Sequence, residues 1–339
     1  MRPAPRHTAR MNIAILGDGG WGTALGVVLN RNGHRVRVWG PFADYIRSIT
    51  EKRENTKFLP GVPLPTGIEW TADKAHAVAE AEVVVLAVPS RFFKQVAADF
   101  APLLPKGVLA VSVAKGLDKQ THRRLTEIAQ EQLGGAPVAA LSGPSHAEEV
   151  ARGVPSAVVI ACTDHDRAVA LQQVFNSAEF RVYTSDDVVG VELGGALKNV
   201  IAVAAGISDG IGFGDNTKAA LITRGLAEIT RLGVARGARA ETFSGLSGIG
   251  DLIVTCASKL SRNRGVGERL GKGESLDAIM GGMEQVAEGI WTCQAALDLA
   301  TELGVEVPIT EQVVAIVHHG RDPREAVQAL MGREPKREK

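Results

Sequence analysis

The 339-residue chain has few cysteines, few aromatic residues and no net charge. Its three cysteines, Cys162, Cys256 and Cys293, lie far apart and lack the short spacings of a zinc site. With 38 basic and 38 acidic residues, the chain offers no overall field that would recruit nucleic acid or an anionic membrane. These shortages argue against a nucleic-acid partner, a metal centre or a disulfide framework, and they favour a reduced, cytoplasmic compartment.

Long apolar runs and a secretory leader are also lacking. The first ten residues carry Arg2, Arg6 and Arg10 without a following apolar core, so they do not read as a signal peptide, and Met11 is an alternative start. No run approaches the ~18 apolar residues that a membrane span needs, so stable membrane insertion is not expected. Hydrophobic residues make up 45% of the chain, as in ordinary globular proteins, and its length suggests about two domains.

A glycine-rich stretch near the N-terminus has the arrangement of a dinucleotide-binding turn. The apolar run 12–16 is followed at once by Gly17, Gly19 and Gly22 in Gly-x-Gly-x-x-Gly spacing, and a helix-forming run extends to Asn30. The glycines permit a tight turn and let a pyrophosphate approach a helix N-terminus. We therefore expect NAD or NADP to bind here, although an unrelated strand–turn–helix unit could carry the same spacing.

The residues that follow the second expected strand, at 35–39, do not indicate whether NAD or NADP binds. An acid at this point would hold the ribose 2′-hydroxyl of NAD, and a nearby arginine would accept the 2′-phosphate of NADP. Gly40, Pro41 and Phe42 supply neither group, and Arg47 lies a helical turn further on. The choice between NAD and NADP stays open on this evidence.

Strand and helix signals alternate as far as residue 185. Further apolar strands are expected at 82–89, 107–114, 138–142, 154–162 and 180–183, with a helix at 164–176. This alternation predicts an α/β class with a doubly wound, mostly parallel sheet, a Rossmann-type domain over residues 1–185.

Residues that follow these strands are candidates for ligand contact, because open α/β sheets bind ligands at the carboxyl ends of their strands. Lys115 follows the strand at 107–114 and is a candidate on this ground. Phe92 and Phe93 follow an earlier strand and are placed either to pack against a nicotinamide ring or to fill the core.

One motif after the strand at 138–142 has a purely structural interpretation. Ser145 and Glu148 have the spacing of a capping box, which would explain both residues as the start of a helix. His146 lies between them and is interpreted as incidental rather than as a catalytic base.

After Ser185 the strand signals nearly vanish. Helix-periodic segments follow at 186–207, 216–232, 276–280, 292–303 and 311–317, which predicts an all-helical second domain over residues 186–339. The first of these segments is apolar almost all round, so its helix should be buried. Lys198 in its middle is therefore unexpected, and it is either functional or a lysine whose stem is buried while its ammonium reaches the surface.

A polar stretch in this second half suits a phosphate group. Ser261, Arg262 and Asn263 place several donors together in an otherwise neutral region, and arginine offers a planar fork to phosphate oxygens. The alternative is a solvated basic loop.

Five motifs in fixed order carry a family resemblance. They are Gly-Asp-Gly-Gly-Trp-Gly-Thr-Ala at 17–24, Ser-Gly-Pro-Ser-His-Ala-Glu-Glu-Val at 142–150, Glu-Leu-Gly-Gly-Ala-Leu-Lys-Asn-Val-Ile-Ala at 192–202, Gly-Ile-Gly-Asp-Leu at 248–252 and Ser-Arg-Asn-Arg at 261–264. Over residues 12–330 the chain resembles the NAD(P)-dependent sn-glycerol-3-phosphate dehydrogenases of bacteria.

The resemblance implies an oxidoreductase that interconverts dihydroxyacetone phosphate and sn-glycerol 3-phosphate by hydride transfer with NAD(P)H, supplying glycerophospholipid synthesis. It implies Lys198 as the catalytic residue, and it allows a homodimer. The implied substrate-binding residues are Lys115, Gly143, Ser145, Lys198, Asp251, Ser261, Arg262 and Asn263. The implied cofactor-binding residues are Gly17, Gly19, Gly20, Trp21, Gly22, Lys115, Ala147, Arg262, Val286 and Glu288.

The sequence departs from the family pattern at one place. Relatives usually carry a basic residue at position 41 or an arginine at position 42, whereas this chain has Pro41 and Phe42. We therefore expect NADH to be used at least as well as NADPH. Two other interpretations stay open: a β-hydroxyacid dehydrogenase, which would bind a carboxylate near 261–264, and a non-catalytic nicotinamide sensor.

Overall fold

The computed structural model describes residues 9–283, 287–335 and 337. By its internal contacts the chain divides into two compact units. Unit 1 comprises Met1–Ala114 and Leu125–Val188, and unit 2 comprises Lys115–Arg124 and Val189–Lys339. The predicted boundary after residue 185 lies three residues before the break at Val188. The prediction differs for Lys115–Arg124, which it placed in the first domain although these residues pack within unit 2.

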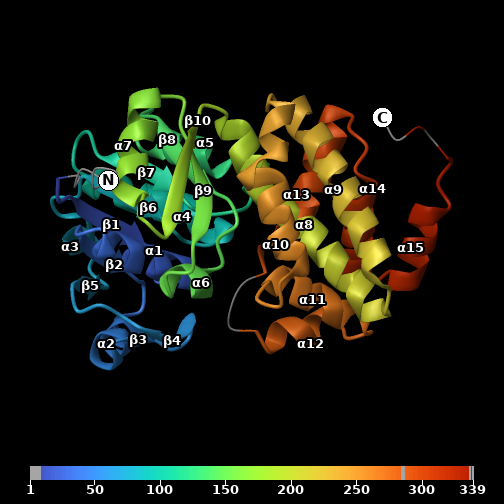
Figure 1. The fold of residues 1–339 in the computed structure, drawn as a ribbon, viewed down its shortest axis with the longest axis horizontal. Coiled ribbons are helices and arrows are strands. Elements are labelled where there is room, and N and C mark those ends of the chain that lie inside the picture. The colour runs from blue at the N-terminus through green and yellow to red at the C-terminus, as the bar shows by residue number, and fades with distance from the viewer. Residues whose placement is uncertain (1–8, 284–286, 336, 338–339) are drawn as a thin grey trace, which may run out of the picture. The chain divides into compact units, whose positions relative to one another are not determined.

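Unit 1 is built on an eight-stranded sheet, which confirms the predicted α/β class (Figure 1). Its strand order is β10-β9-β8-β7-β6-β1-β2-β5, and all neighbouring strands are parallel except the antiparallel pair β8–β9. The strands are β1 Asn12–Leu16, β2 Arg35–Trp39, β5 Ile68–Thr71, β6 Val83–Leu86, β7 Leu109–Ser112, β8 Val138–Ser142, β9 Ser156–Ala161 and β10 Phe180–Ser185. A small separate hairpin, β3 Glu54–Asn55 with β4 Leu59–Pro63, was not expected from the sequence.

Helices cover both faces of this sheet, as a doubly wound fold requires. They are α1 Gly20–Arg31, α2 Ala43–Lys52, α3 Lys74–Val78, α4 Ser90–Phe100, α5 Leu125–Gln132, α6 Ala147–Ala151 and α7 His165–Phe175, with a 3₁₀ turn, η1, at Ala101–Leu103. Because side chains alternate along a strand, Ile13 and Ile15 of β1 join the core under α1 and α7, whereas Leu16 joins the core under α3, α4 and α5. The switch in sheet order at β1 leaves the carboxyl ends of β1 and β6 beside the glycine-rich turn.

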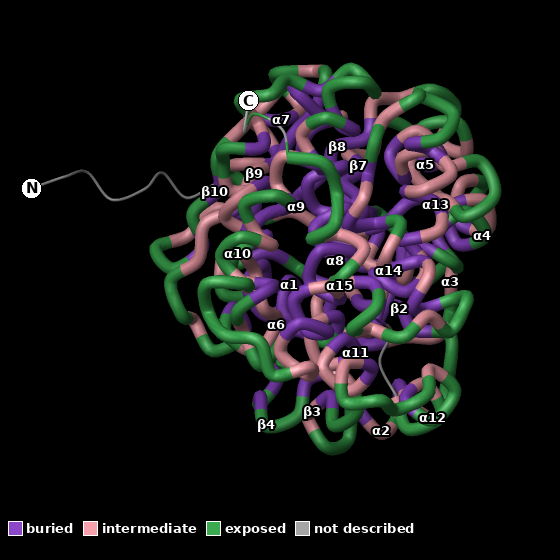
Figure 2. The backbone as a smooth tube through the Cα atoms, turned by 90° about the vertical axis from the view of Figure 1, so that its right-hand side faces the viewer, coloured by how far each residue is buried: buried purple, intermediate pink, exposed green. Residues whose placement is uncertain are grey.

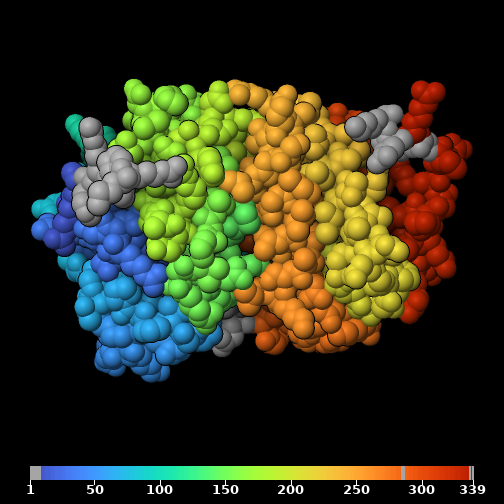
Figure 3. Space-filling model, viewed as in Figure 1, coloured from blue at the N-terminus to red at the C-terminus, as the bar shows by residue number. Residues whose placement is uncertain are grey.

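Unit 2 is helical, which confirms the predicted all-α part of the chain. Its elements are α8 Val188–Ile211, α9 Asp215–Ala235, η2 Ala240–Ser244, η3 Leu246–Gly250, α10 Asp251–Ala257, α11 Arg262–Gly271, α12 Leu276–Gly281, α13 Glu288–Leu303, α14 Pro308–His319 and α15 Pro323–Met331. In the space-filling view the yellow atoms of α9 lie beside the orange atoms of α10, with which α9 is in contact (Figure 3).

The helix α8 is the centre of unit 2, and most of its backbone is buried (Figure 2). Two apolar clusters pack on its sides, one containing Leu197 and Ile201 and the other containing Val200 and Val203. By length and composition alone the 24-residue helix α8 could cross a membrane, since its most apolar window has a mean hydropathy of 1.6, and the sequence analysis did not anticipate such a candidate. Since 89% of its most apolar window is buried by the protein, it is here a core helix.

Candidate functional site

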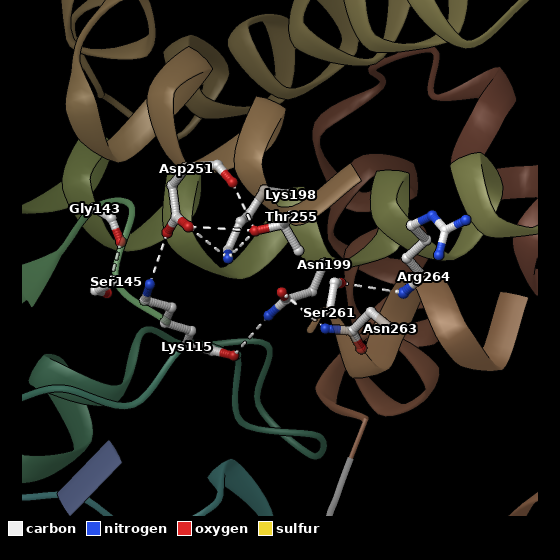
Figure 4. Close-up of polar contacts among 10 residues, drawn as sticks. All are labelled: Lys115, Gly143, Ser145, Lys198, Asn199, Asp251, Thr255, Ser261, Asn263 and Arg264. Carbon is white, nitrogen blue, oxygen red and sulfur yellow. Dashed lines mark hydrogen bonds and ion pairs between the residues drawn. The ribbon is translucent and has the colours of Figure 1, made fainter. Parts of the chain in front are cut away.

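Lys198 lies in a buried cluster of charged side chains in unit 2 (Figure 4). Only 6% of Lys198 is exposed, and its Nζ donates to Asp251 Oδ1 at 2.7 Å and to Thr255 Oγ1 at 2.5 Å. The other carboxylate oxygen, Asp251 Oδ2, accepts a hydrogen bond from Lys115 Nζ at 2.7 Å. One carboxylate therefore bridges two ammonium groups, and the alternative of a lysine that reaches the surface is wrong.

Local sequence explains why these side chains can meet. A Cβ atom on Gly194, one turn before Lys198, would lie 2.5 Å from Ser247 O, so only a glycine lets the η3 backbone approach α8 this closely. Asp251 is the first residue of α10, directly after η3, and Thr255 follows one helical turn later on the same face. Thr255 Oγ1 also donates to Asp251 O at 2.6 Å, which ties the two positions together.

Burial and charge act in opposite directions on the cluster. Burial lowers the pKa of Lys198 to about 8, because the nearby Asp251 carboxylate only partly offsets the loss of hydration and Lys115 adds a second positive charge. Burial alone would raise the pKa of Asp251, but Lys115 and Lys198 together hold it below its ordinary value. Near neutral pH the cluster therefore holds a carboxylate and a lysine that can give up its proton readily.

The segment that carries Lys115 is anchored within unit 2. Leu117 is 4% exposed in the apolar cluster beside α8, and Arg124 forms an ion pair of 2.7 Å with Glu192 of α8. His122 contacts the carboxylate of Glu302 at 2.9 Å. Asn199 donates to Lys115 O at 3.4 Å, so backbone and side-chain contacts together fix Lys115 next to Asp251.

The polar stretch 261–264 forms the start of helix α11 rather than the loop that the sequence suggested. Ser261 caps the helix, accepting at its Oγ a hydrogen bond from Arg264 N at 3.2 Å. Arg262 is the exposed first residue of α11, whereas Asn263 is 9% exposed and donates to Asn199 Oδ1 at 3.0 Å. Asn263 therefore contacts Asn199, the residue that follows Lys198 in α8.

An ion pair and a glycine contact fix α11 on α8. Asp209 of α8 accepts two hydrogen-bonded contacts from Arg264, at 2.8 Å from Nε and 2.7 Å from a terminal guanidinium nitrogen. A Cβ atom on Gly206 would lie 2.0 Å from Arg264 O, and one on Gly267 would lie 2.1 Å from Val203 O. The two backbones therefore touch directly, which sets the start of α11 relative to Lys198.

The glycine-rich turn in unit 1 fits the pyrophosphate of a dinucleotide. Gly17 has φ +129°, and a Cβ atom there would lie 2.6 Å from Ala87 O. Helix α1 starts at Gly20, and its N-cap, Gly19, makes no side-chain capping bond and has open space where a Cβ would project. Uncapped backbone N–H groups at an open helix N-terminus are suited to bind phosphate oxygens.

Other predicted residues of unit 1 lie near this turn or after β8. Trp21 follows Gly20 in α1, and a Cβ atom on Gly20 would lie 3.8 Å from the Cβ of Ala147. Gly143 has φ +136° and follows β8 directly. Ser145 Oγ donates to Gly143 O at 2.8 Å (Figure 4).

The capping-box interpretation of Ser145 and Glu148 is wrong. Helix α6 begins at Ala147, and its N-cap is His146, whose side chain makes no capping bond. Ser145 lies one residue before the N-cap, and its hydroxyl donates to Gly143 O, a local side-chain-to-backbone bond.

The remaining candidates are placed as follows. Glu288 is the first residue of α13, and Val286 lies outside the described residues. Phe93 is fully buried in the core beneath α4, as one of its two interpretations required, whereas Phe92 is 49% exposed. Across the part of the chain that the structure describes, no group of three or more His, Cys, Asp or Glu residues is placed to hold a metal ion.

Sequence reasoning missed three residues of this site: Thr255, Asn199 as a partner of Asn263, and Asp209. Thr255 could have been found from its spacing of one helical turn after Asp251. Asp209 and Arg264 carry no such signal, because they are far apart in the sequence and meet only through the packing of α8 on α11.

Comparisons with known proteins agree with this architecture. Models of the N-terminal and C-terminal parts of NAD-dependent glycerol-3-phosphate dehydrogenase match residues 12–168 and 187–328. The chain is 52% identical to glycerol-3-phosphate dehydrogenase [NAD(P)+] of Geobacillus kaustophilus, with 96% of each chain covered, and 49% identical to that of Chlorobium luteolum, with 97% and 100% covered. The crystal structure of glycerol-3-phosphate dehydrogenase from Coxiella burnetii is similar with a TM-score of 0.93 at 39% identity, over 96% of this chain and 99% of that one. This chain therefore belongs to the NAD-dependent glycerol-3-phosphate dehydrogenase family.

Proposed function

We propose that this protein is an oxidoreductase that interconverts dihydroxyacetone phosphate and sn-glycerol 3-phosphate with NAD(P)H. The observation that carries the proposal is the buried cluster of Lys198, Asp251 and Lys115, which supplies a proton and positive charge in a desolvated place. A chain that bound nicotinamide only as a sensor would not need such a cluster. The family membership of the chain supports the same reaction.

In this proposal the glycine-rich turn of unit 1 binds the pyrophosphate of the cofactor. The turn of Gly17, Gly19, Gly20 and Gly22 and the start of α1 would hold this group through backbone N–H donors. Trp21, Ala147, Lys115, Arg262, Val286 and Glu288 are further cofactor contacts that the family resemblance implies. When bound, NAD(P)H supplies the hydride for the reduction.

Lys198 provides the proton in the same reaction. As hydride adds to the carbonyl carbon, the electron pair of the C=O π bond moves to oxygen and forms an alkoxide. The alkoxide takes a proton from the Lys198 ammonium, so the products are the secondary alcohol and neutral Lys198. The ammonium charges of Lys198 and Lys115 stabilise the developing negative charge before the proton moves. In the oxidation direction neutral Lys198 accepts the hydroxyl proton.

The substrate is oriented through its phosphate group. Ser261, Arg262 and Asn263 at the start of α11 offer donors and a helix N-terminus, both of which suit a phosphate dianion. Gly143 and Ser145 are the further substrate contacts implied by the family resemblance. Because α11 is fixed on α8, a phosphate held there sets the carbonyl group relative to Lys198.

The residue two positions after Gly40 supports the use of NADH. Phe42 is 69% exposed and carries no charge. The family resemblance implies a basic residue at position 41 or an arginine at position 42, and this chain has neither. Arg47 is paired at the surface with Asp44 at 3.4 Å. We therefore expect NADH to be used at least as well as NADPH, and Phe42→Arg to shift the ratio towards NADPH.

The test is steady-state reduction of dihydroxyacetone phosphate with NADH and with NADPH, beside a panel of β-oxo acids that carry a carboxylate. The proposal expects turnover of the phosphate substrate alone. Preferential reduction of a carboxylate substrate would indicate a β-hydroxyacid dehydrogenase, and binding of NADH without turnover of either would indicate a sensor.

The proposal also covers the cellular location, the oligomeric state and the metabolic role of the enzyme. We place it in the cytoplasm, as a homodimer that supplies glycerophospholipid synthesis. Light scattering coupled to size-exclusion chromatography measures the mass of the particle against the 35.7 kDa of one chain. A monomeric mass would remove the homodimer from the proposal without affecting the reaction.

A further inference from the structure

Asp18, the second residue of the glycine-rich turn, has an unusual environment. It is 8% exposed, and its Oδ2 atom is buried without a hydrogen-bond partner among the described residues. Buried carboxylate oxygens are normally hydrogen-bonded, because an unmet acceptor in a dry environment costs free energy. This oxygen of Asp18 therefore has an acceptor capacity that the described residues do not meet.

The carboxylate of Asp18 lies against the carboxyl end of strand β2. A Cβ atom on Gly40, the residue after β2, would lie 2.5 Å from Asp18 Oδ2 and 2.6 Å from its Cγ. Only a glycine at position 40 leaves room for this carboxylate. In dinucleotide-binding domains the end of this strand normally carries the acid that holds the adenosine ribose. Here the strand lacks the acid, and the turn after β1 brings one to the same place.

The position of Asp18 is fixed by its own backbone. Its carbonyl oxygen accepts hydrogen bonds from Asn55 Nδ2 at 2.7 Å and from Thr23 Oγ1 at 3.4 Å. Asn55 is fully buried, and its Oδ1 accepts a hydrogen bond from Tyr45 at 2.5 Å. The unexpected hairpin β3–β4 thus holds the turn through Asn55, and the direction of the Asp18 side chain follows.

The charged side chains on α2 neither pair with the Asp18 carboxylate nor take its place beside Gly40. Asp44 and Arg47 are exposed by 94% and 68% of their side chains and pair with each other at the surface. Burial raises the pKa of Asp18 more than the hydrogen bond from its own backbone N–H and the charge of Lys57 together lower it, so burial is the dominant influence on this carboxylate. A negative charge at this point repels a phosphate dianion.

We propose that Asp18 performs the role of the acid that is absent from the end of β2. Its carboxylate accepts a hydrogen bond from the adenosine ribose hydroxyl of NADH, and its charge disfavours binding of the 2′-phosphate of NADPH. The inference rests on the proposed function only in requiring that unit 1 binds a nicotinamide dinucleotide. It names a residue that selects between the two cofactors, independently of the substrate.

The test is isothermal titration of the whole protein with NADH and NADPH, and with ADP-ribose and its 2′-phosphate, which lack the reactive ring. Wild-type protein should bind the forms without the 2′-phosphate more tightly. Asp18→Asn keeps the size of the side chain and removes its charge. It should weaken NADH binding by about tenfold or more, the effect of losing a hydrogen bond to a charged group, and should not weaken NADPH binding.

Asp44→Asn is the matched control, because it removes the same charge from an exposed acid on α2. Its affinities should stay within about twofold of wild type, as expected for an exposed charge. Wild-type protein that binds NADPH as tightly as NADH would overturn the inference, and so would an Asp18→Asn protein that loses both affinities equally or neither. Because these titrations contain no substrate, failure to reduce dihydroxyacetone phosphate would count against the proposed function alone.

Discussion

Asp251→Asn should move the pH dependence of turnover, because Asp251 is the counter-charge of Lys198. Each ammonium lies 2.7 Å from one carboxylate oxygen, a gross attraction of roughly 6 kcal/mol per pair at an effective dielectric constant of about 20. Much of this attraction offsets the cost of burying the charges. An opposite charge at this range typically shifts a pKa by ~1–3 units, so without Asp251 the pKa of Lys198 should fall from about 8 to roughly 5–7.

The sign of the effect follows from the direction of the reaction. Reduction of the carbonyl needs protonated Lys198, so wild-type turnover should be full at low pH and decline as the pH rises through about 8. In Asp251→Asn the decline should begin below neutrality. At pH 7.5 the protonated fraction would fall by roughly threefold to more than a hundredfold over that range of pKa values.

The measurement is kcat/KM for dihydroxyacetone phosphate between pH 5.5 and about 10 at saturating NADH, a range that covers the wild-type pKa of about 8 and the upper part of the range expected for Asp251→Asn. Thr255→Val serves as the graded control, since it removes a hydrogen bond to Lys198 without removing a charge. Its decline should shift less than that of Asp251→Asn. An Asp251→Asn enzyme whose activity still declines near pH 8 would refute the reasoning, because Lys198 would then not depend on that carboxylate.

Three further substitutions test the phosphate-binding residues and the packing of the helices in unit 2. Arg262→Ala should weaken substrate binding by ~1.5–3 kcal/mol, the range for a hydrogen bond to a charged group, and unchanged KM values for substrate and NADH would remove Arg262 from the site. Gly267→Ala should lower the free energy of unfolding by about 1–3 kcal/mol, because the new Cβ would lie 2.1 Å from Val203 O. Gly265→Ala is the control, since a Cβ there would project into open space in the same helix and should not lower the stability. Equal effects of the two changes in urea unfolding would contradict the close contact of α11 with α8. Glu228→Ala leaves two backbone N–H groups at the start of α14 without their carboxylate, and it should lower the free energy of unfolding by about 1–3 kcal/mol or more. Glu228→Gln, which keeps one acceptor oxygen, should be closer to wild type. No loss of stability in Glu228→Ala would show that water replaces the carboxylate.

The parts of the fold that the sequence predicts well are those with strong local signals. The apolar run 12–16 and the following glycines predict β1 and α1, and both are present. The helix expected at 186–207 is α8, which extends to Ile211. In these stretches hydrophobic periodicity and turn chemistry agree, so little depends on the rest of the chain.

Helix α11 shows why other parts could not be predicted. Its sequence, with Gly265, Gly267 and Gly271 in ten residues, has poor intrinsic helix propensity and therefore looks like a loop. The helix forms because Gly267 and Gly271 let it pack backbone to backbone on α8. Tertiary contact overrides local propensity here, and single-sequence reasoning has no access to that contact.

The candidate site divides in the same way. The contact between Lys198 and Asp251 could be predicted, because a buried lysine requires a counter-charge and Asp251 follows a glycine-rich stretch. The packing of Lys115 within unit 2 could not, since that residue lies between segments of unit 1. The burial of the Asp18 carboxylate against Gly40 could not be predicted either, because these residues follow different strands and meet only in the folded sheet.

The most direct test of the central claim is single-turnover reduction of dihydroxyacetone phosphate by Lys198→Ala with NADH already bound. Loss of a general acid typically lowers the rate by ~10²–10⁴-fold, and we expect at least that decrease, while the Kd for NADH stays close to wild type. Thermal unfolding should show an intact fold, because alanine suits a helix and the change removes a buried charge. A Lys198→Ala protein that binds NADH and reduces the substrate at the wild-type rate would contradict the assignment of Lys198 as the proton donor.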